Sequence, residues 1–260
     1  MSTVEYERDG AIATIRLNRP DRLNAIDADT AHALLDACRQ ASRDPDARAL
    51  VIRGEGRAFM AGGDVSDFHA AGADAPELVR GIIGLLEESV QLLDGLRIPV
   101  VARAQGAVAG AGFSLMMAAD VVVAAEDLRI AFAYTSIGTT PDGGLSWSLP
   151  RAVGLRRALE IGLLGEPIEA QEALRLGLVT KVLPLDELDA ATAKIAARLA
   201  GGPTLAYGRT RELLRGSSRH TLPEQLALER ESFVASAGTE DFREGVAAFI
   251  ERRRADFHGR

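Results

Sequence analysis

The sequence predicts an α/β fold that continues into a helical C-terminal segment. Short β-type runs alternate with amphipathic helices up to about residue 150, which is typical of layered α/β proteins. Beyond Pro150 the apolar residues recur almost wholly at helical spacing. The chain has 260 residues, 47% of them hydrophobic, which is enough for a large buried core and excludes disorder as the main state. No linker composition marks a boundary, and we expect a core at 1–200 with an appended segment at 201–260.

The chain is expected to begin with a β-hairpin and a capped helix. Val4–Glu7 and Ala11–Leu17 are alternating runs joined by Asp9-Gly10, a dipeptide that favours tight hairpin turns. Asp27 can cap a helix whose apolar stripe includes Cys38. We therefore expect Cys38 to be a packing residue rather than a reactive thiol.

Buried strands and one long helix are expected next. Arg48–Arg53 and Ile98–Arg103 read as strands, and between them Pro76 opens a helix with a continuous apolar stripe. Glu87 falls at the margin of that stripe. Val121–Ala125 is a solid apolar run, as expected for a strand covered on both faces.

The C-terminal third is predicted to be helical. The expected helices lie near 155–163, 169–176, 186–200, 204–215, 222–236 and 240–252. The last of them carries Phe242, Val246, Phe249 and Ile250 at helical spacing, a stripe that needs a surface to pack on. We therefore expect a homo-oligomer.

Composition excludes several classes of function. The 37 Asp and Glu against 30 Lys and Arg give a net charge of −7, which disfavours nucleic-acid binding. One cysteine and four scattered histidines indicate neither a disulfide framework nor a metal site. The N-terminus opens with a charged strand, and apolar runs are far shorter than the ~20 residues of a membrane span. We expect a cytoplasmic protein without membrane contact.

Two glycine-rich segments, Phe59–Asp64 and Gly106–Gly112, are candidates for ligand contact. Small side chains let backbone approach a ligand, and a helix following the second segment would present free N–H groups to a developing oxyanion. Glycines also serve turns and tight packing, which is the alternative for either segment alone. The spacing does not match the G-x-G-x-x-G of dinucleotide-binding turns.

Several ordered motifs resemble the crotonase (enoyl-CoA hydratase/isomerase) superfamily. They are Leu17–Ala25, Phe59–Asp64, Val101–Val121, Leu149–Gly154 and Glu172–Val179. The resemblance implies a spiral of repeated ββα units, with C-terminal helices that build trimers, often paired as hexamers. It also implies an acyl-CoA thioester as ligand, so that coenzyme A belongs to the substrate and no further cofactor is expected.

The resemblance also implies site residues. The two oxyanion donors would be the backbone N–H groups of Gly63 and Ala111. Ala111 stands where the family usually has glycine, so its φ must be negative. The two glutamates of typical hydratases would fall at Ser114 and Tyr134, and neither residue is a carboxylate. Asp142 resembles the catalytic aspartate of some family isomerases and of aryl-CoA dehalogenases.

Asp142 and Glu87 each leave an alternative open. Asp142 stands in Pro-Asp-Gly and could simply form a turn. A dehalogenase would need a histidine where this chain has Glu87, which makes halide displacement improbable. Glu87 is either a second acid/base group or a partly solvated helix residue. One carboxylate beside an oxyanion hole suits double-bond isomerisation, with hydratase-type lyase activity or a catalytically weak acyl-CoA-binding paralogue as alternatives.

Further residues are expected around the ligand. The acyl pocket would involve Met60, Phe68, Glu87, Ser114, Met116, Tyr134 and Trp147, with core packing as the alternative for Met116 and Trp147. The CoA contacts would involve Arg22, Ala25, Ala61, Asp64 and Val65. The region of Phe249, Arg252 and Phe257 is expected to reach a neighbouring subunit's nucleotide.

Overall fold

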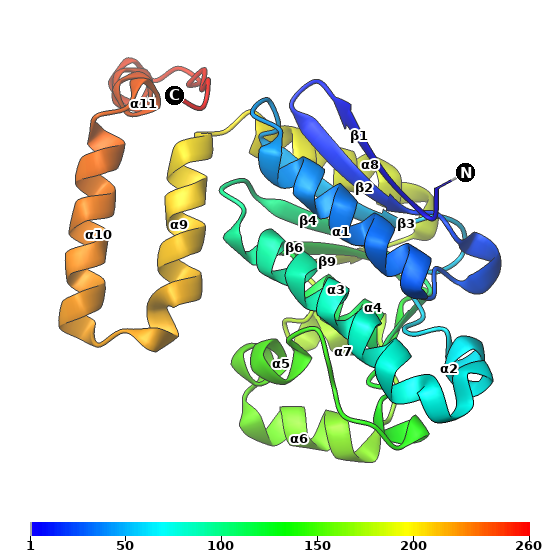
Figure 1. The fold of residues 1–260 in the computed structure, drawn as a ribbon. Helices are drawn as coiled ribbons and strands as arrows, with labels where there is room; N and C mark the ends of the chain where they lie inside the picture. The colour runs from blue at the N-terminus through cyan, green and yellow to red at the C-terminus, as the bar shows by residue number, and fades with distance from the viewer. Residues whose placement is uncertain (1) are drawn as a thin grey trace.

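The computed structural model describes residues 2–260 and contains two sheets (Figure 1). The larger sheet has the strand order β1-β2-β3-β4-β6-β9, and only the β1–β2 pair is antiparallel. Its strands are β1 Val4–Asp9, β2 Ile12–Leu17, β3 Ala49–Gly54, β4 Val100–Ala104, β6 Val121–Ala125 and β9 Lys181–Leu183. The smaller sheet has the order β5-β7-β8, from Ala107–Ala109, Arg129–Ala131 and Ile168–Glu169.

The strands repeat in pairs, as a ββα spiral requires. β4 joins the large sheet and β5 the small one before helix α4 (Ala111–Met117) begins. β6 and β7 then divide between the two sheets in the same way, and β7 lies parallel to β5. The predicted α/β class is confirmed.

Helices cover both faces of the large sheet (Figure 1). Helices α1 (Ala28–Arg43) and α3 (Ala75–Gly95) lie on one face and α8 (Leu185–Ala200) on the other. Successive strand residues point to opposite faces, so Leu50 and Ile52 join the larger core while Val51 packs toward α8. The sheet is therefore covered on both faces, as was predicted for β6 from its solid apolar run.

The local elements at the N-terminus agree with the sequence. Gly10 has a φ of 56° in the hairpin turn. The Asp27 carboxylate accepts the N–H of Thr30 at 2.8 Å and so caps α1. Cys38 is 1% exposed, and burial raises the pKa of its thiol to about 12. The expectation of a packing cysteine is confirmed.

The remaining helices include those predicted beyond Pro150. They are α2 Val65–Ala71, α5 Leu145–Val153, α6 Leu155–Leu164, α7 Ala170–Arg175, α9 Thr204–Gly216, α10 Leu222–Ala237 and α11 Glu240–Glu251, with short 3-10 turns at Pro20–Arg22, Gly72–Asp74, Thr135–Ile137 and Ser217–Arg219. No helix within residues 2–260 combines the length and apolar character needed to cross a bilayer.

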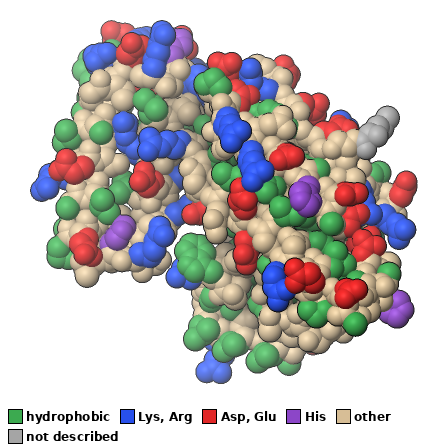
Figure 2. Space-filling model, viewed as in Figure 1, with side chains coloured by type: hydrophobic (Ala, Val, Ile, Leu, Met, Phe, Trp, Pro, Cys, Tyr) green, Lys and Arg blue, Asp and Glu red, His purple; other side chains and the backbone are tan. Residues whose placement is uncertain are grey.

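Helices α10 and α11 stand away from the body, to which α9 connects them (Figure 1). Their apolar side chains are open to solvent in the single chain, Phe249 being 86% and Ile250 75% exposed. Hydrophobic side chains are visible on the surface of this part of the chain and again over α6 (Figure 2). Trimerisation and the division between 200 and 201 stay predictions.

A buried arginine holds α9 to the body. Arg211 is 8% exposed, and its Nε donates to the Asp120 carboxylate at 2.6 Å. The same guanidinium donates to the main-chain carbonyls of Leu93, at 3.1 Å, and of Leu96 at the end of α3. Asp120 also accepts the N–H of Val100, so one ion pair connects α9, α3 and β4.

Arg211→Ala should lower the free energy of unfolding by about 3 kcal/mol, because two buried carbonyls lose their donor and Asp120 keeps only Arg215 as a cationic partner. Urea denaturation followed by circular dichroism measures this change. Arg230→Ala is the matched control, since its pair with Glu231 at 3.1 Å is exposed, and should change stability by less than about 0.5 kcal/mol. Equal effects of the two substitutions would contradict the anchoring role.

Candidate active site

Backbone pairing brings the two glycine-rich segments together. The N–H of Met60 donates to the carbonyl of Ala107 at 3.3 Å, and the N–H of Ala109 donates to the carbonyl of Met60 at 3.0 Å. A methyl group on Gly112 would lie 2.1 Å from the carbonyl oxygen of Met60, so this crossing requires glycine. Two motifs that are about fifty residues apart in the sequence thus form one structural unit.

Near its end, each segment has a main-chain N–H that donates to no acceptor within the described residues. Ile26 pairs with the carbonyl of Gly62 and with the N–H of Asp64, at 2.8 and 2.9 Å, which holds Gly63 between them. Within residues 2–260, the N–H groups of Gly63 and Ala111 donate to no protein acceptor. Ala111 is the first residue of α4 and lies outside the positive-φ residues, which confirms the backbone geometry predicted for it.

Both residues line one cavity of about 220 Å³. Its apolar walls come mainly from α2, α3 and the turn after β7. These side chains are Ile26, Val65, Phe68, Val79, Ile82, Ile83, Leu86 and Ile137. Tyr134 and Asp142 are the titratable residues in the described lining. The cavity therefore presents an apolar surface with free N–H groups and one carboxyl.

Asp142 occupies the turn that leads into α5. Gly143 and Gly144 follow it with φ of 52° and 80°, so the turn-forming interpretation of Pro-Asp-Gly is correct, and the side chain lines the cavity as well. Burial raises the pKa of Asp142, against the opposing effect of the hydrogen bond from Tyr134. The negative charge of Glu87 raises the pKa of Asp142 further.

Two hydroxyls stand behind Asp142. Tyr134 Oη donates to Asp142 Oδ1 at 2.7 Å and lies 2.9 Å from Ser114 Oγ. Ser114 Oγ donates to the main-chain carbonyl of Asp142 at 3.0 Å. Burial and the negative charge of Asp142 raise the pKa of Tyr134 above its ordinary value, so its hydroxyl is neutral. The sequence places Ser114 and Tyr134 near the ligand, but no sequence signal shows that they bond to Asp142.

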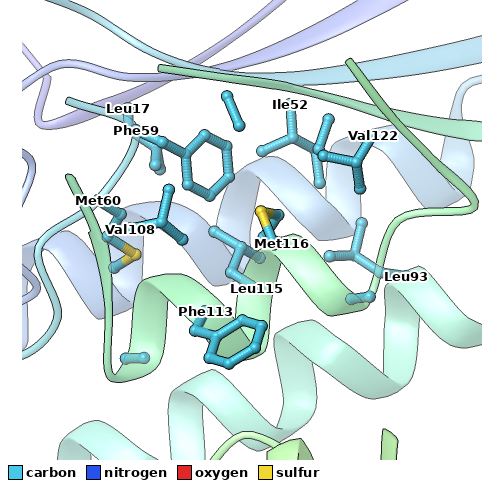
Figure 3. Close-up of a cluster of buried hydrophobic side chains, with 14 of the residues drawn as sticks. Leu17, Ile52, Phe59, Met60, Leu93, Val108, Phe113, Leu115, Met116 and Val122 are labelled. Atoms are coloured by element: carbon cyan, nitrogen blue, oxygen red, sulfur yellow. The ribbon is translucent and has the colours of Figure 1, made fainter. Parts of the chain in front are cut away.

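The other predicted pocket residues divide into two groups. Phe68 lines the cavity beside Gly63. Met60 and Met116 are fully buried in the core beneath the large sheet (Figure 3), so their assignment to the pocket is corrected to core packing. Glu87 is exposed and lies outside the described lining, where it acts on Asp142 through its charge. Trp147 is 43% exposed on α5 and stacks on a guanidinium instead of facing the cavity.

The residues predicted to hold CoA lie around the start of α2. Ala61 and Val65 line the cavity, and Val65 is 51% exposed. Ala25 is buried and directly precedes Ile26, the residue that pairs with the loop. Arg22 is exposed in its 3-10 turn. Both main-chain polar groups of Asp64 already bond within the protein, since its N–H donates to Ile26 and its carbonyl accepts the N–H groups of Asp67 and Phe68. These CoA assignments stay predictions.

Arg19, a partly buried cation within the N-terminal motif, is a site residue that no sequence signal predicts. Its Nη2 lies 3.0 Å from Asp27 and 3.4 Å from Asp64. Asp27, Asp64 and Asp67 bring carboxylate oxygens within 4.8 Å of one another, and Arg19 supplies the positive charge that this acidic cluster requires. The ion pair fixes α1 against the loop that carries Gly63.

Comparisons with known proteins show the family of the chain. Residues 7–260 match the sequence pattern of the family described as "Enoyl-CoA hydratase/isomerase". A Rhodobacter capsulatus protein named "Probable enoyl-CoA hydratase" is 39% identical over 258 residues, which cover 99% of this chain and 98% of that protein. The Escherichia coli K12 protein "1,2-epoxyphenylacetyl-CoA isomerase" is 35% identical, with 96% and 95% covered. An enoyl-CoA hydratase structure from Polaromonas sp. JS666 has a TM-score of 0.93 at 34% identity, with 98% and 99% covered.

Asp142→Asn should stabilise the protein at neutral to alkaline pH and not at acidic pH. Because folding raises the pKa of Asp142, this carboxyl contributes stability below its unfolded pKa and loses that contribution as pH rises through its folded pKa. We expect the free energy of unfolding to rise by about 1 kcal/mol near pH 8, measured in urea, and the gain to vanish in acid. Asp21→Asn, at an exposed position, should show no such pH dependence. Destabilisation near pH 8 would contradict the expectation.

Proposed function

Because the chain belongs to the enoyl-CoA hydratase/isomerase family, we propose that it shifts the double bond of a 3-enoyl-CoA to position 2. The observation that carries this proposal is Asp142, a single carboxyl lining the same cavity as two free main-chain N–H groups. An isomerase needs one group that takes a proton and returns it. The apolar walls favour an uncharged acyl group.

The proposed reaction begins at the thioester carbonyl. Its oxygen accepts hydrogen bonds from the N–H groups of Gly63 and Ala111, each of which stabilises the transition state by about 3 kcal/mol. Asp142 takes the proton from C2, and the electrons of that C–H bond form a dienolate that extends to C4. Asp142 then returns the proton to C4, which leaves a double bond between C2 and C3 and restores the carbonyl.

Hydration by two carboxylates fits this cavity less well. The positions that correspond to the hydratase glutamates carry Ser114 and Tyr134, which contact each other at 2.9 Å. Neither hydroxyl can activate water near neutral pH, since the pKa of Tyr134 is raised above its ordinary value. The names of the relatives include both hydratase and isomerase, so the acid/base residues of this chain are what favour isomerisation.

We propose that the active form is a homotrimer or a dimer of trimers. The exposed apolar side chains of α10 and α11, among them Phe233, Phe249 and Ile250, support an interface between copies. The nucleotide of CoA is proposed to contact Arg22 and the backbone of Ala25, Ala61, Asp64 and Val65. Arg252 and Phe257 of a neighbouring subunit are proposed to complete that site.

Asp142→Asn should abolish isomerisation, with a loss of about 10²-fold to 10⁴-fold in kcat, because the amide cannot accept the C2 proton. The assay incubates wild type and variant separately with a 3-enoyl-CoA and a 2-enoyl-CoA and separates the products chromatographically. Full isomerase activity in the variant would refute the role of Asp142. Hydration of the 2-enoyl-CoA without isomerisation would favour the lyase, and binding without turnover would favour the acyl-CoA-binding paralogue.

Ala111→Pro should lower kcat by about 10²-fold to 10³-fold, because proline removes one oxyanion donor. The first residue of a helix tolerates proline, so α4 should still form. Ala111→Gly is the matched control, since it keeps the N–H and should retain most activity. Steady-state kinetics of both variants, with circular dichroism to verify folding, measures the difference. Equal activity of the two would contradict the use of this N–H.

A further inference from the structure

Three polar groups close a ring behind the cavity. They are the Asp142 carboxyl, the Tyr134 hydroxyl and the Ser114 hydroxyl, with the main-chain carbonyl of Asp142 completing the circuit. The three contacts measure 2.7, 2.9 and 3.0 Å. Ser114 and Tyr134 are 2% and 5% exposed, so the ring must largely satisfy itself.

Counting hydrogens shows that the ring is incomplete when Asp142 is ionised. A carbonyl oxygen can only accept, so the single hydrogen of Ser114 is donated to the main chain of Asp142. The single hydrogen of Tyr134 is donated to Asp142 Oδ1. No hydrogen then remains for the contact between the two hydroxyl oxygens, which face each other at 2.9 Å.

One added proton completes the ring. If Asp142 is protonated on Oδ1, the carboxyl donates to Tyr134 Oη, Tyr134 donates to Ser114 Oγ, and Ser114 donates to the main-chain carbonyl of Asp142. Each of the three contacts then has its own hydrogen, and all three donors point the same way around the ring, an arrangement in which hydrogen bonds strengthen one another.

We propose that Ser114 is a positioning residue that favours the protonated form of Asp142, because a proton on Oδ1 lets the hydrogen-bond ring close through Tyr134. Ser114 acts only through Tyr134, by accepting the hydrogen that Tyr134 must redirect. This inference rests on the proposed function only in taking Asp142 as the base that moves the proton.

The charged side chains near the ring make no hydrogen bond to the Ser114 hydroxyl in the described structure. Glu87 on α3 raises the pKa of the carboxyl through its charge. Asp94, Arg215 and Arg219 line a groove on the far side of Ser114. All four remain in place when only the Ser114 hydroxyl is removed, so a change in the titration of Asp142 then reports on the ring.

Ser114→Ala distinguishes the ring from simple donation. If the ring forms, the alanine variant removes the oxygen that accepts the Tyr134 hydrogen in the protonated form. The acid dissociation constant of Asp142 should then increase by about fivefold. If Ser114 instead donated to Tyr134 and reinforced its bond to the carboxylate, the constant would decrease. Carbon-13 NMR of the full-length, substrate-free protein with labelled Asp carboxyls measures it, with Asp142→Asn identifying the signal.

Three further comparisons make the test specific. Ser89→Ala removes another buried hydroxyl, which donates to the carbonyl of Leu85 at 2.8 Å, and should leave the constant unchanged. Ser114→Cys keeps a weak acceptor, so its change should have the same sign and a smaller size, which serves if the alanine variant does not fold. In a Tyr134→Phe background, Ser114→Ala should have no effect.

An unchanged or decreased constant in Ser114→Ala, or an equal effect in the Tyr134→Phe background, would overturn the inference. The expected result also predicts that the acidic limb of the isomerase pH profile moves to lower pH. Because the titration needs no substrate, absence of isomerase activity would refute the proposed function and leave this test intact.

Discussion

The pairing of Met60 with β5 is the contact on which the site depends. It connects the loop after β3 to the segment that begins α4. This connection brings Gly63 and Ala111 to the same cavity. The pairing requires close backbone approach, which Gly112 permits against the carbonyl of Met60. The glycines of both motifs therefore serve packing and chemistry together, because the packing is what places the free N–H groups.

Helix α3 links the core to the cavity. Leu93 is fully buried under the large sheet, whereas Ile82 and Leu86, further toward the N-terminus, line the cavity. One apolar stripe thus begins as a pocket wall and ends as core packing. At the end of the same helix the buried Arg211 binds the final carbonyls, so the C-terminal helices are attached to the element that forms the wall.

Periodicity and capping were sufficient to predict most elements, because these signals are local. The hairpin at Gly10, the cap at Asp27 and the helices beyond Pro150 all follow from residues close in sequence. The helical backbone of Ala111 followed from the steric limit on its methyl group. Met60 and Met116 were misplaced because a residue beside a ligand loop can point into the core, and the direction depends on strand pairing far away. The contact of Tyr134 with Asp142 depends on how a loop folds back, which no spacing shows.

Electrostatics connects the side chains at 114, 134 and 142. A carboxyl at 142 is favoured when the side chains at 114 and 134 are uncharged hydroxyls. Asp142 Oδ1 lies 2.7 Å from the Tyr134 hydroxyl, and an ionised glutamate at that position would place two negative charges in a poorly solvated space. In such a pair the pKa of one carboxyl is raised strongly, and the two carboxyls share a proton and titrate together. A carboxylate at 142 is therefore compatible with neutral partners at 114 and 134, and two glutamates there would disfavour it. Neutral hydroxyls at 114 and 134 thus allow Asp142 to be the one carboxyl in the described lining of the cavity.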